Sequence, residues 1–175
     1  MRRLLLFRHS KAERLQPGGH DRDRVLAASG RADATKLGLY LARHGLAPDV
    51  VLISPSARTT ETWALASVAL KPTPAATPER RIYEASPATL FEVAAGAPAR
   101  ASSVMLVGHN PGLHELAVSL IASGDVDTRE RLHEELPTSG LVVIDFAFDD
   151  WRKLHAHSGR LERFVTPEAL DISPR

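Results

Sequence analysis

Two arginines and two histidines of this 175-residue chain each stand shortly after an apolar run that has the length of a buried strand. They are Arg8 and His9, near the start of the chain, and Arg58 and His109. The planar guanidinium of arginine matches the oxygens of a phosphate group. A neutral imidazole is a good nucleophile near pH 7, because its ordinary pKa is about 6.5. Brought together, these groups would support phosphoryl transfer to an imidazole, with Arg8, Arg58 and a protonated His109 holding the phosphoryl oxygens without a metal ion.

The elements predicted around these residues would bring them together. Leu4–Phe7, Asp49–Ile53 and Ser103–Val107 are short apolar runs, which are typical of strands covered on both faces. Ser54–Pro55 supplies an N-cap and a first-turn proline, so Arg58 falls in the first turn of the next helix. Strands that alternate with helices predict an α/β fold, a three-layer αβα sandwich with a mainly parallel, mixed central sheet. Such sheets bind ligands beyond the carboxyl ends of their strands.

The other predicted elements follow from capping, turn and periodicity signals. Helices are expected over 29–44, 54–70, 86–95 and 110–124, and a loop over 71–80. Short strands are expected at Ile82–Tyr83 and at Leu141–Phe146, and a hairpin or paired strands over Arg152–Val165.

The composition excludes several classes of site and partner. There is no cysteine, so disulfides, thiolate-bound zinc, iron–sulfur clusters and cysteine nucleophiles are excluded. The net charge is +1 and no basic run is present, so neither nucleic acid nor a membrane surface is expected as a partner. The apolar run before Arg8 is too short for an export signal, and no segment has the length and apolarity of a membrane span. We expect a cytoplasmic protein that folds as a single domain over residues 1–175.

Taken alone, each candidate residue has an ordinary explanation. Arg8–His9 would be a loop pair, Arg58 a solvated side chain and His109 a capping or packing histidine. Their shared place just past predicted strands favours a common site. His155 and His157 would face the same way on a strand, but no third ligand is evident, so we expect no zinc site and no metal elsewhere.

The three loops resemble the motifs of a known family. Leu6–Ser10 is similar to the Arg-His-Gly signature of the histidine phosphatase superfamily, the phosphoglycerate-mutase-like enzymes. Ser54–Thr62 and Val107–Pro111 resemble the second and third motifs of that superfamily. Asp23–Leu26, followed by Gly30, resembles a segment of the short SixA-type phosphohistidine phosphatases, with valine where that branch usually has proline. A serine follows the first histidine, whereas the mutases carry glycine there. The resemblance spans roughly residues 3–165.

The resemblance implies a role for each matched residue. His9 would be the nucleophile, and Arg8, Arg58 and His109 would form the phosphate pocket. It also implies a phosphoglycerate-mutase-like fold, with a mixed sheet flanked by helices, and a reaction without a metal or other cofactor.

Two further residues have less specific signals. Many family members carry a glutamate after the third strand that protonates the leaving group, and Glu84 stands at about that place; its alternative is a surface carboxylate. Arg24 would contact the substrate because of its motif position, or else pair with Asp21 or Asp23.

Three functions are compatible with these residues. The leading hypothesis is a phosphohistidine phosphatase that acts on a phosphorylated protein, for example a histidine phosphotransfer domain, since a short chain leaves little sequence for a lid over the pocket. The second is a phosphomonoesterase that hydrolyses a small phosphorylated metabolite at the same site. The third is an adaptor that binds phosphate without turnover, which release of phosphate from p-nitrophenyl phosphate would exclude.

Overall fold

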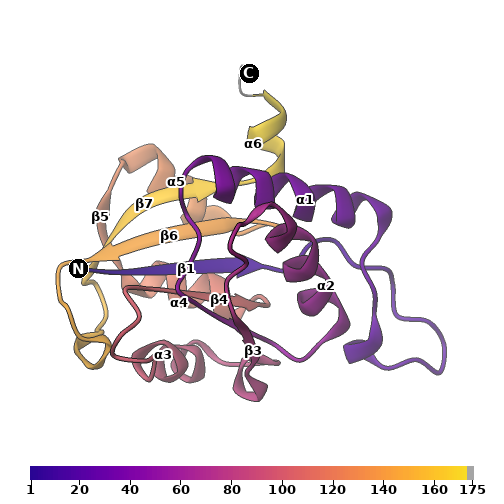
Figure 1. Cartoon of the computed structure of the whole chain (residues 1–175), viewed down its shortest axis with the longest axis horizontal. Coiled ribbons are helices and arrows are strands. Elements are labelled where there is room, and N and C mark those ends of the chain that lie inside the picture. The colour runs from indigo at the N-terminus through magenta and orange to yellow at the C-terminus, as the bar shows by residue number, and fades with distance from the viewer. Residues whose placement is uncertain (173–175) are drawn as a thin grey trace.

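The computed structural model describes residues 1–172, whose centre is a mixed β-sheet with strand order β3-β2-β4-β1-β6-β7-β5 (Figure 1). Its strands are β1 (Arg2–Arg8), β2 (Val50–Ile53), β3 (Ala76–Pro78), β4 (Ser103–Gly108), β5 (Ile121–Gly124), β6 (Leu141–Phe146) and β7 (Gly159–Val165). Strands β3, β2, β4 and β1 run parallel to one another, and β6 is antiparallel to both β1 and β7. The mainly parallel α/β sheet is therefore confirmed.

Helices cover both faces of the sheet, as a three-layer sandwich requires (Figure 1). They are α1 (Ala28–Arg43), α2 (Ala57–Ala66), α3 (Pro87–Ala95), α4 (Gly112–Leu120), α5 (Val126–Glu134) and α6 (Pro167–Ile172). Helices α1, α2 and α6 pack on one face, while α3, α4 and α5 bury side chains on the other. None of the helices in the described part of the chain has the length and apolarity needed to cross a membrane.

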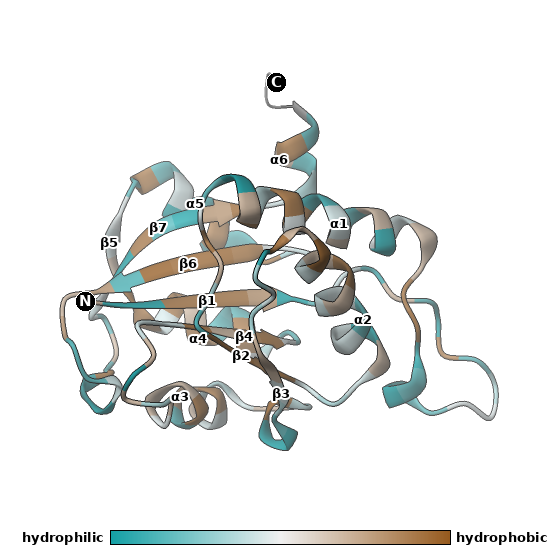
Figure 2. Ribbon diagram, viewed as in Figure 1, coloured by the Kyte–Doolittle hydropathy of each residue, from teal (hydrophilic) through white to brown (hydrophobic). Residues whose placement is uncertain are grey.

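Strand β1 explains why the core forms two layers. Leu4 and Leu6 are fully buried in the cluster beneath α3 and α4, and Leu5 and Phe7 are buried in the cluster beneath α1 and α2. Successive side chains of a strand point to opposite faces, so a strand in the middle of the sheet is apolar at every position. Figure 2 shows this apolar band continuing along β6.

The register of the parallel strands aligns their carboxyl ends. Phe7 of β1 pairs with Val107 of β4, which in turn pairs with Ile53 of β2. The next residues of the three strands therefore leave the sheet side by side, and the backbone N–H of His9 donates to the carbonyl of Gly108 (3.0 Å).

Parts of the predicted secondary structure are wrong. Ile82–Tyr83 is not a strand: Ile82 ends the 3₁₀ turn η3 (Arg80–Ile82), and the strand of this region is β3, inside the predicted loop. All three residues of β3 are exposed, so this edge strand carries no apolar pattern. The tail takes the paired-strand alternative, because β7 pairs with β6 and β5 and the turn η4 (Trp151–Lys153) precedes it.

The stretch predicted as a helix over 110–124 is instead α4 followed by β5, and the sequence pattern missed α5 altogether. Asp125 caps α5 by accepting a hydrogen bond from the N–H of Thr128 (2.9 Å). Leu132 is the buried residue of this helix, so no periodic apolar stripe marks it in the sequence. The remaining predicted helices are found as α1, α2 and α3, within a few residues of their predicted ends, and the strand at Leu141–Phe146 is β6.

Candidate active site

The four residues singled out by their place in the sequence lie together at the carboxyl edge of the sheet. Arg8 ends β1, His9 follows it, His109 follows β4, and Arg58 lies in the first turn of α2. The rings of His9 and His109 are tilted against each other with centroids 5.3 Å apart. His9 and Arg58 are buried, and Arg8 and His109 are partly buried.

The ring of His9 presents a free nitrogen lone pair. Its Nδ1 lies 2.7 Å from the carbonyl oxygen of Ser10. A carbonyl can only accept, so Nδ1 carries the proton and Nε2 is left unprotonated. Burial, and to a lesser extent the charges of Arg58 and Arg8, lower the pKa of His9 to about 4. The ring is therefore neutral at pH 7.

Hydroxyl groups behind His9 fix its backbone. The N–H of Ser10 donates to Oγ1 of Thr62 (2.9 Å), and that hydroxyl donates to the carbonyl of Arg58 in α2 (2.6 Å). The N–H of Ser139 donates to the carbonyl of His9 (3.1 Å). Residues from β1, α2 and the loop before β6 thus hold the nucleophile candidate, and a site built on fixed elements keeps its geometry.

Both arginines are held by part of their guanidinium groups. Nη1 of Arg8 donates to the carbonyl of Leu136 (3.0 Å), and burial lowers the pKa of Arg8. Arg58 donates from Nη1 to the carbonyl of Asp21 (2.9 Å) and from Nη2 to Oδ2 of the same residue (3.0 Å). In both arginines Nε is buried and has no partner within residues 1–172. Buried polar groups are normally hydrogen-bonded, so two such donors in one pocket suit an anionic ligand.

His109 is held by a serine that was predicted to cap a helix. Nε2 of His109 lies 2.7 Å from Oγ of Ser54, and Nδ1 is buried without a partner in the described residues. The N-cap of α2 is instead Ser56, whose Oγ accepts from the N–H of Thr59 (3.3 Å). The helix therefore begins at Ala57, two residues later than Pro55, because the backbone of Ser56 is still extended (φ −119°, ψ 155°). Arg58 remains in the first turn of the helix.

The structure indicates the protonation state of His109 before an anion binds. Burial and the nearby charge of Arg58 lower the pKa of His109 to about 3, so the ring is neutral at pH 7. The sequence could not indicate this, because both causes depend on the folded surroundings. A bound phosphate dianion would act in the opposite direction and raise the pKa of this ring.

Arg24 and Glu84 lie around the pocket in different ways. Arg24 takes the ion-pair alternative: Nη1 donates to Oδ1 of Asp21 (3.1 Å) and Nε to the carbonyl of Glu13 (2.9 Å). Glu84 is exposed, has a left-handed backbone (φ 53°) and makes no hydrogen bond or ion pair with the described residues. It lines a pocket of about 440 Å³ that also includes His109 and Glu115.

Two residues of the site were not identified from the sequence. Asp21 was considered only as a partner of Arg24, and Tyr83 only as part of a strand. The hydroxyl of Tyr83 donates to Oδ2 of Asp21 (2.6 Å), and its ring packs edge-on against His109, with centroids 5.6 Å apart. No sequence motif signals this arrangement, because the partners come from three separate loops.

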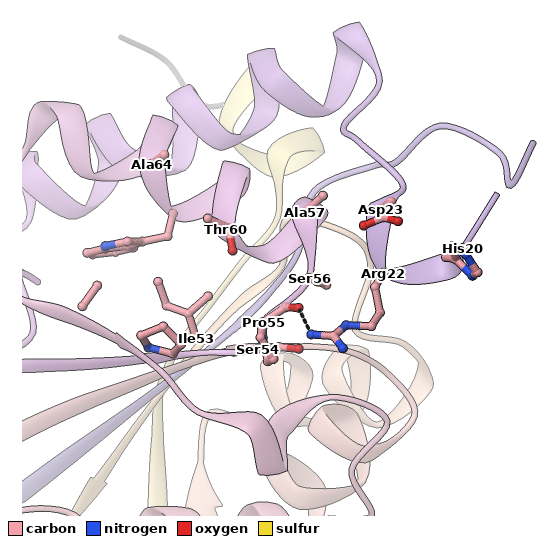
Figure 3. Close-up of a pocket in the computed structure, with 13 residues that line it drawn as sticks. His20, Arg22, Asp23, Ile53, Ser54, Pro55, Ser56, Ala57, Thr60 and Ala64 are labelled. Carbon is pink, nitrogen blue, oxygen red and sulfur yellow. Dashed lines mark hydrogen bonds between the residues drawn. The ribbon is translucent and has the colours of Figure 1, made fainter.

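A larger cavity, of about 990 Å³, lies beside the four residues rather than around them. Figure 3 shows it between α2, the end of β2 and the turn η1 (Asp21–Asp23), with Arg22 reaching across to the carbonyl of Pro55 (3.1 Å). Ser54 lines this cavity and also contacts His109. Within residues 1–172, no group of three or more His, Asp or Glu side chains is arranged to hold a metal ion.

Known proteins resemble this chain in sequence and in fold. Residues 4–86 match the family model of the histidine phosphatase superfamily (branch 1). An uncharacterized protein of Mycobacterium tuberculosis is 32% identical over 163 residues, which cover 92% of this chain and 99% of that protein.

Two solved structures are assigned as the phosphohistidine phosphatase SixA. The protein from Agrobacterium tumefaciens is 29% identical with a TM-score of 0.77, over 95% of this chain and 98% of that chain. The protein from Nakamurella multipartitia is 25% identical with a TM-score of 0.82, over 95% of this chain and 96% of that chain. The phosphoglycerate-mutase-like fold is thereby confirmed, and the chain is a SixA-like phosphatase of the histidine phosphatase superfamily.

Proposed function

We propose that this phosphatase removes phosphate from phosphohistidine on another protein, by taking the phosphoryl group onto Nε2 of His9 and then transferring it to water. The observation that carries the proposal is the state of the His9 ring. Nδ1 of the ring donates its proton to a hydrogen bond with the carbonyl of Ser10, and the pKa of about 4 keeps the ring neutral. At pH 7 the ring is therefore a nucleophile with its lone pair on Nε2.

The reaction would proceed in two steps, and the neighbouring arginines would stabilise the charge of the phosphoryl group in both. In the first step the bond from phosphorus to Nε2 forms and the bond from phosphorus to the leaving group breaks. In the second step the oxygen of a water molecule bonds to phosphorus and the bond from phosphorus to Nε2 breaks. The protons of the water leave with the phosphate, so His9 returns to its neutral form. Arg8 and Arg58 have unpartnered buried Nε–H donors, which would bind the phosphoryl oxygens as charge moves onto them. His109 is neutral before the substrate binds. The negative charge of a bound phosphate dianion would raise its pKa, so the ring would become protonated in the complex.

The surroundings of Glu84 support phosphohistidine as the substrate. An imidazole that carries a proton on its second nitrogen leaves as a neutral ring, so the enzyme does not have to supply an acid. Glu84, the residue at the place of the family's acid, is exposed and is not held by any described side chain. Similarity to SixA proteins points the same way, because the two solved structures carry the name phosphohistidine phosphatase.

The experiment is a rapid quench with a phosphohistidine-bearing phosphotransfer domain as substrate. We expect acid-labile, alkali-stable phosphate on the enzyme, located by peptide mapping to His9. His9→Ala should carry no label, and His133→Ala, which changes an exposed histidine in α5, should be labelled like the wild type. A label that survives in His9→Ala would refute the proposal.

A small-molecule phosphomonoesterase is the second candidate, and one observation favours it. Glu84 and Glu115 line the same pocket as His109, so a carboxylic acid is available near the leaving group of an ester. An alkoxide needs such an acid, because its conjugate alcohol has a pKa far above 7. A comparison of kcat/KM for a phosphohistidine protein and for a panel of phosphorylated metabolites decides between the two.

A further inference from the structure

A single acidic residue holds the guanidinium of Arg58. Asp21 accepts from Nη2 of Arg58 through its carboxylate (3.0 Å) and from Nη1 through its backbone carbonyl (2.9 Å). The side chain of Arg58 is only 7% exposed, so water does not compete freely for these donors. A guanidinium bound at both terminal nitrogens cannot rotate without breaking both bonds.

The carboxylate of Asp21 is itself held at both oxygens. The hydroxyl of Tyr83 donates to Oδ2 (2.6 Å), and Nη1 of Arg24 donates to Oδ1 (3.1 Å). The bond from Tyr83, followed by those from the two arginines, lowers the pKa of Asp21 to about 2. The negative charge is therefore present at any pH at which His9 is neutral.

The same group of residues reaches His109. The ring of Tyr83 packs edge-on against the His109 ring, while its hydroxyl binds Asp21. Arg58 and His109, which come from α2 and the end of β4, are thus connected through Asp21 of η1 and Tyr83. An acidic residue cannot bind a phosphate dianion directly, since the two charges repel each other.

We infer that Asp21 is a positioning residue, which sets the orientation of the Arg58 guanidinium before the substrate arrives. The inference rests on the proposed role of Arg58 in binding the phosphoryl group. With Nη1 and Nη2 bound to Asp21, the buried Nε–H and the second hydrogen of each terminal nitrogen remain for phosphoryl oxygens. Donors that are already oriented stabilise a transition state without reorganisation at the moment of reaction.

The charge of Asp21 gives this role a distinctive signature. Replacement by asparagine loosens Arg58, so kcat should fall. It also removes a negative charge from the pocket, so inorganic phosphate should bind at least as tightly as before. A variant that is merely less stable would not lose turnover while keeping or gaining affinity for phosphate.

The test compares Asp21→Asn with Asp23→Asn, the same substitution two residues away in η1, at a side chain with no ion pair in the described structure. With p-nitrophenyl phosphate we expect kcat of Asp21→Asn to fall at least about tenfold, with Ki for inorganic phosphate unchanged or lower. Asp23→Asn should stay within about twofold of the wild type. In an Arg58→Ala background, Asp21→Asn should cost at most about a further twofold.

Each alternative result overturns the inference. An Asp21→Asn enzyme within about twofold of the wild type would show that Arg58 needs no positioning. The same loss with and without Arg58 would show that Asp21 acts on something else. A Ki for phosphate that rises in proportion to the fall in kcat would show that the substitution disrupts the structure of the whole site.

Two further measurements keep the test decisive. If circular dichroism shows that Asp21→Asn does not fold, Tyr83→Phe replaces it, because this change removes only the hydroxyl and keeps the ring against His109; the same outcomes apply, with an expected loss of about threefold. The rapid-quench experiment on His9 is run in parallel. If the wild type forms no phosphohistidine, the proposed function fails, whereas the coupling between Asp21 and Arg58 is still read from turnover.

Discussion

The proposed phosphate pocket (Arg8, His9, Arg58 and His109) and its rim (Glu84 and Glu115) differ in how firmly their side chains are held. In the pocket, His9 and Arg58 are buried, the His9 ring is hydrogen-bonded to the carbonyl of Ser10, and the guanidinium of Arg58 is hydrogen-bonded to Asp21 of η1. On the rim, Glu84 is exposed and has no hydrogen-bond or ion-pair partner in the described part of the chain. The side chains proposed to bind the phosphoryl group are fixed before any substrate binds, and Glu84, which would face the leaving group, is not.

This difference separates two kinds of catalytic work. Stabilising the charge of a transferring phosphoryl group depends on fixed donors, because reorganisation would cost free energy in the transition state. Proton donation to a leaving group is needed only when that group is a strong base. A pocket of fixed side chains whose rim carries an unheld carboxylate is therefore suited to a leaving group that departs without an acid, as a protonated imidazole does.

The largest effect should come from the nucleophile. His9→Ala should abolish turnover of every phosphorylated substrate, because no phosphoryl–enzyme bond can form. The protein should stay folded, since the change removes a ring at the end of β1 and leaves the apolar part of the strand in place. Steady-state assays together with circular dichroism measure both. Turnover near the wild-type level would place the reaction on another residue.

Removal of one of the side chains proposed to bind the phosphoryl group should have the next largest effect. Arg8→Ala, Arg58→Ala and His109→Ala should each lower kcat/KM by about 10²–10³, the typical cost of losing one oriented donor. Arg58→Lys keeps the charge but loses the planar fork, so it should recover only part of the loss. Arg100→Ala, at an exposed position away from the site, is the control. An Arg58→Ala enzyme within a few-fold of the wild type would mean that its donors do not bind phosphate.

The two regions also differ in how much the sequence predicts. Arg8, His9 and His109 directly follow apolar strands, and parallel strands end at one edge, so their meeting could be inferred from local patterns. The contact between Asp21 and Arg58 joins residues 37 apart through a loop, whose path no periodic pattern records. The neutral state of His109 depends on burial and on neighbouring charges, which exist only in the folded chain.

The same distinction explains the errors in the fold. Strand β3 and helix α5 lie at exposed positions and bury few side chains, so neither leaves an alternating or helical apolar pattern. The central strands have continuous apolar runs, and the helices packed on them have a helical apolar pattern, so both are predictable from the sequence. The strands and the helix that carry Arg8, His9, His109 and Arg58 are among these elements, whereas the turn that carries Asp21 is not.

The pH dependence tests whether the pocket is buried in solution as it is in the structure. Because kcat/KM reports the free enzyme, it should fall as the pH drops through about 4, the pKa of His9, where protonation removes the lone pair. If His9 had the ordinary histidine pKa of 6.5, kcat/KM would begin to fall at that higher pH. A kcat/KM profile measured with a substrate of constant ionisation decides between them.

Stability should follow a different pH range from activity. The folded pKa values of His9 and His109 are about 4 and about 3, below the ordinary 6.5, so the unfolded chain binds protons first as the pH falls. The free energy of unfolding should therefore decline below pH 6.5 and keep declining until both folded rings titrate. Urea unfolding of the wild type and of His109→Ala measures this, and the variant should show the shallower decline. Equal slopes would mean that His109 is not buried in its neutral form.

The smallest effect is expected on the rim, and it separates the two enzyme hypotheses. For a phosphohistidine phosphatase, Glu84→Gln should leave dephosphorylation of a phosphohistidine protein within about twofold of the wild type, while hydrolysis of alkyl phosphates slows. For a phosphomonoesterase, the same change should slow the physiological ester by about 10²–10⁴ and leave p-nitrophenyl phosphate, with its good leaving group, nearly unchanged. Glu115→Gln, in the same pocket, is the matched variant, because it tests whether the effect belongs to one carboxylate. An equal, severe loss on phosphohistidine and ester substrates would contradict the leaving-group argument, and no loss on any substrate would make Glu84 a surface residue.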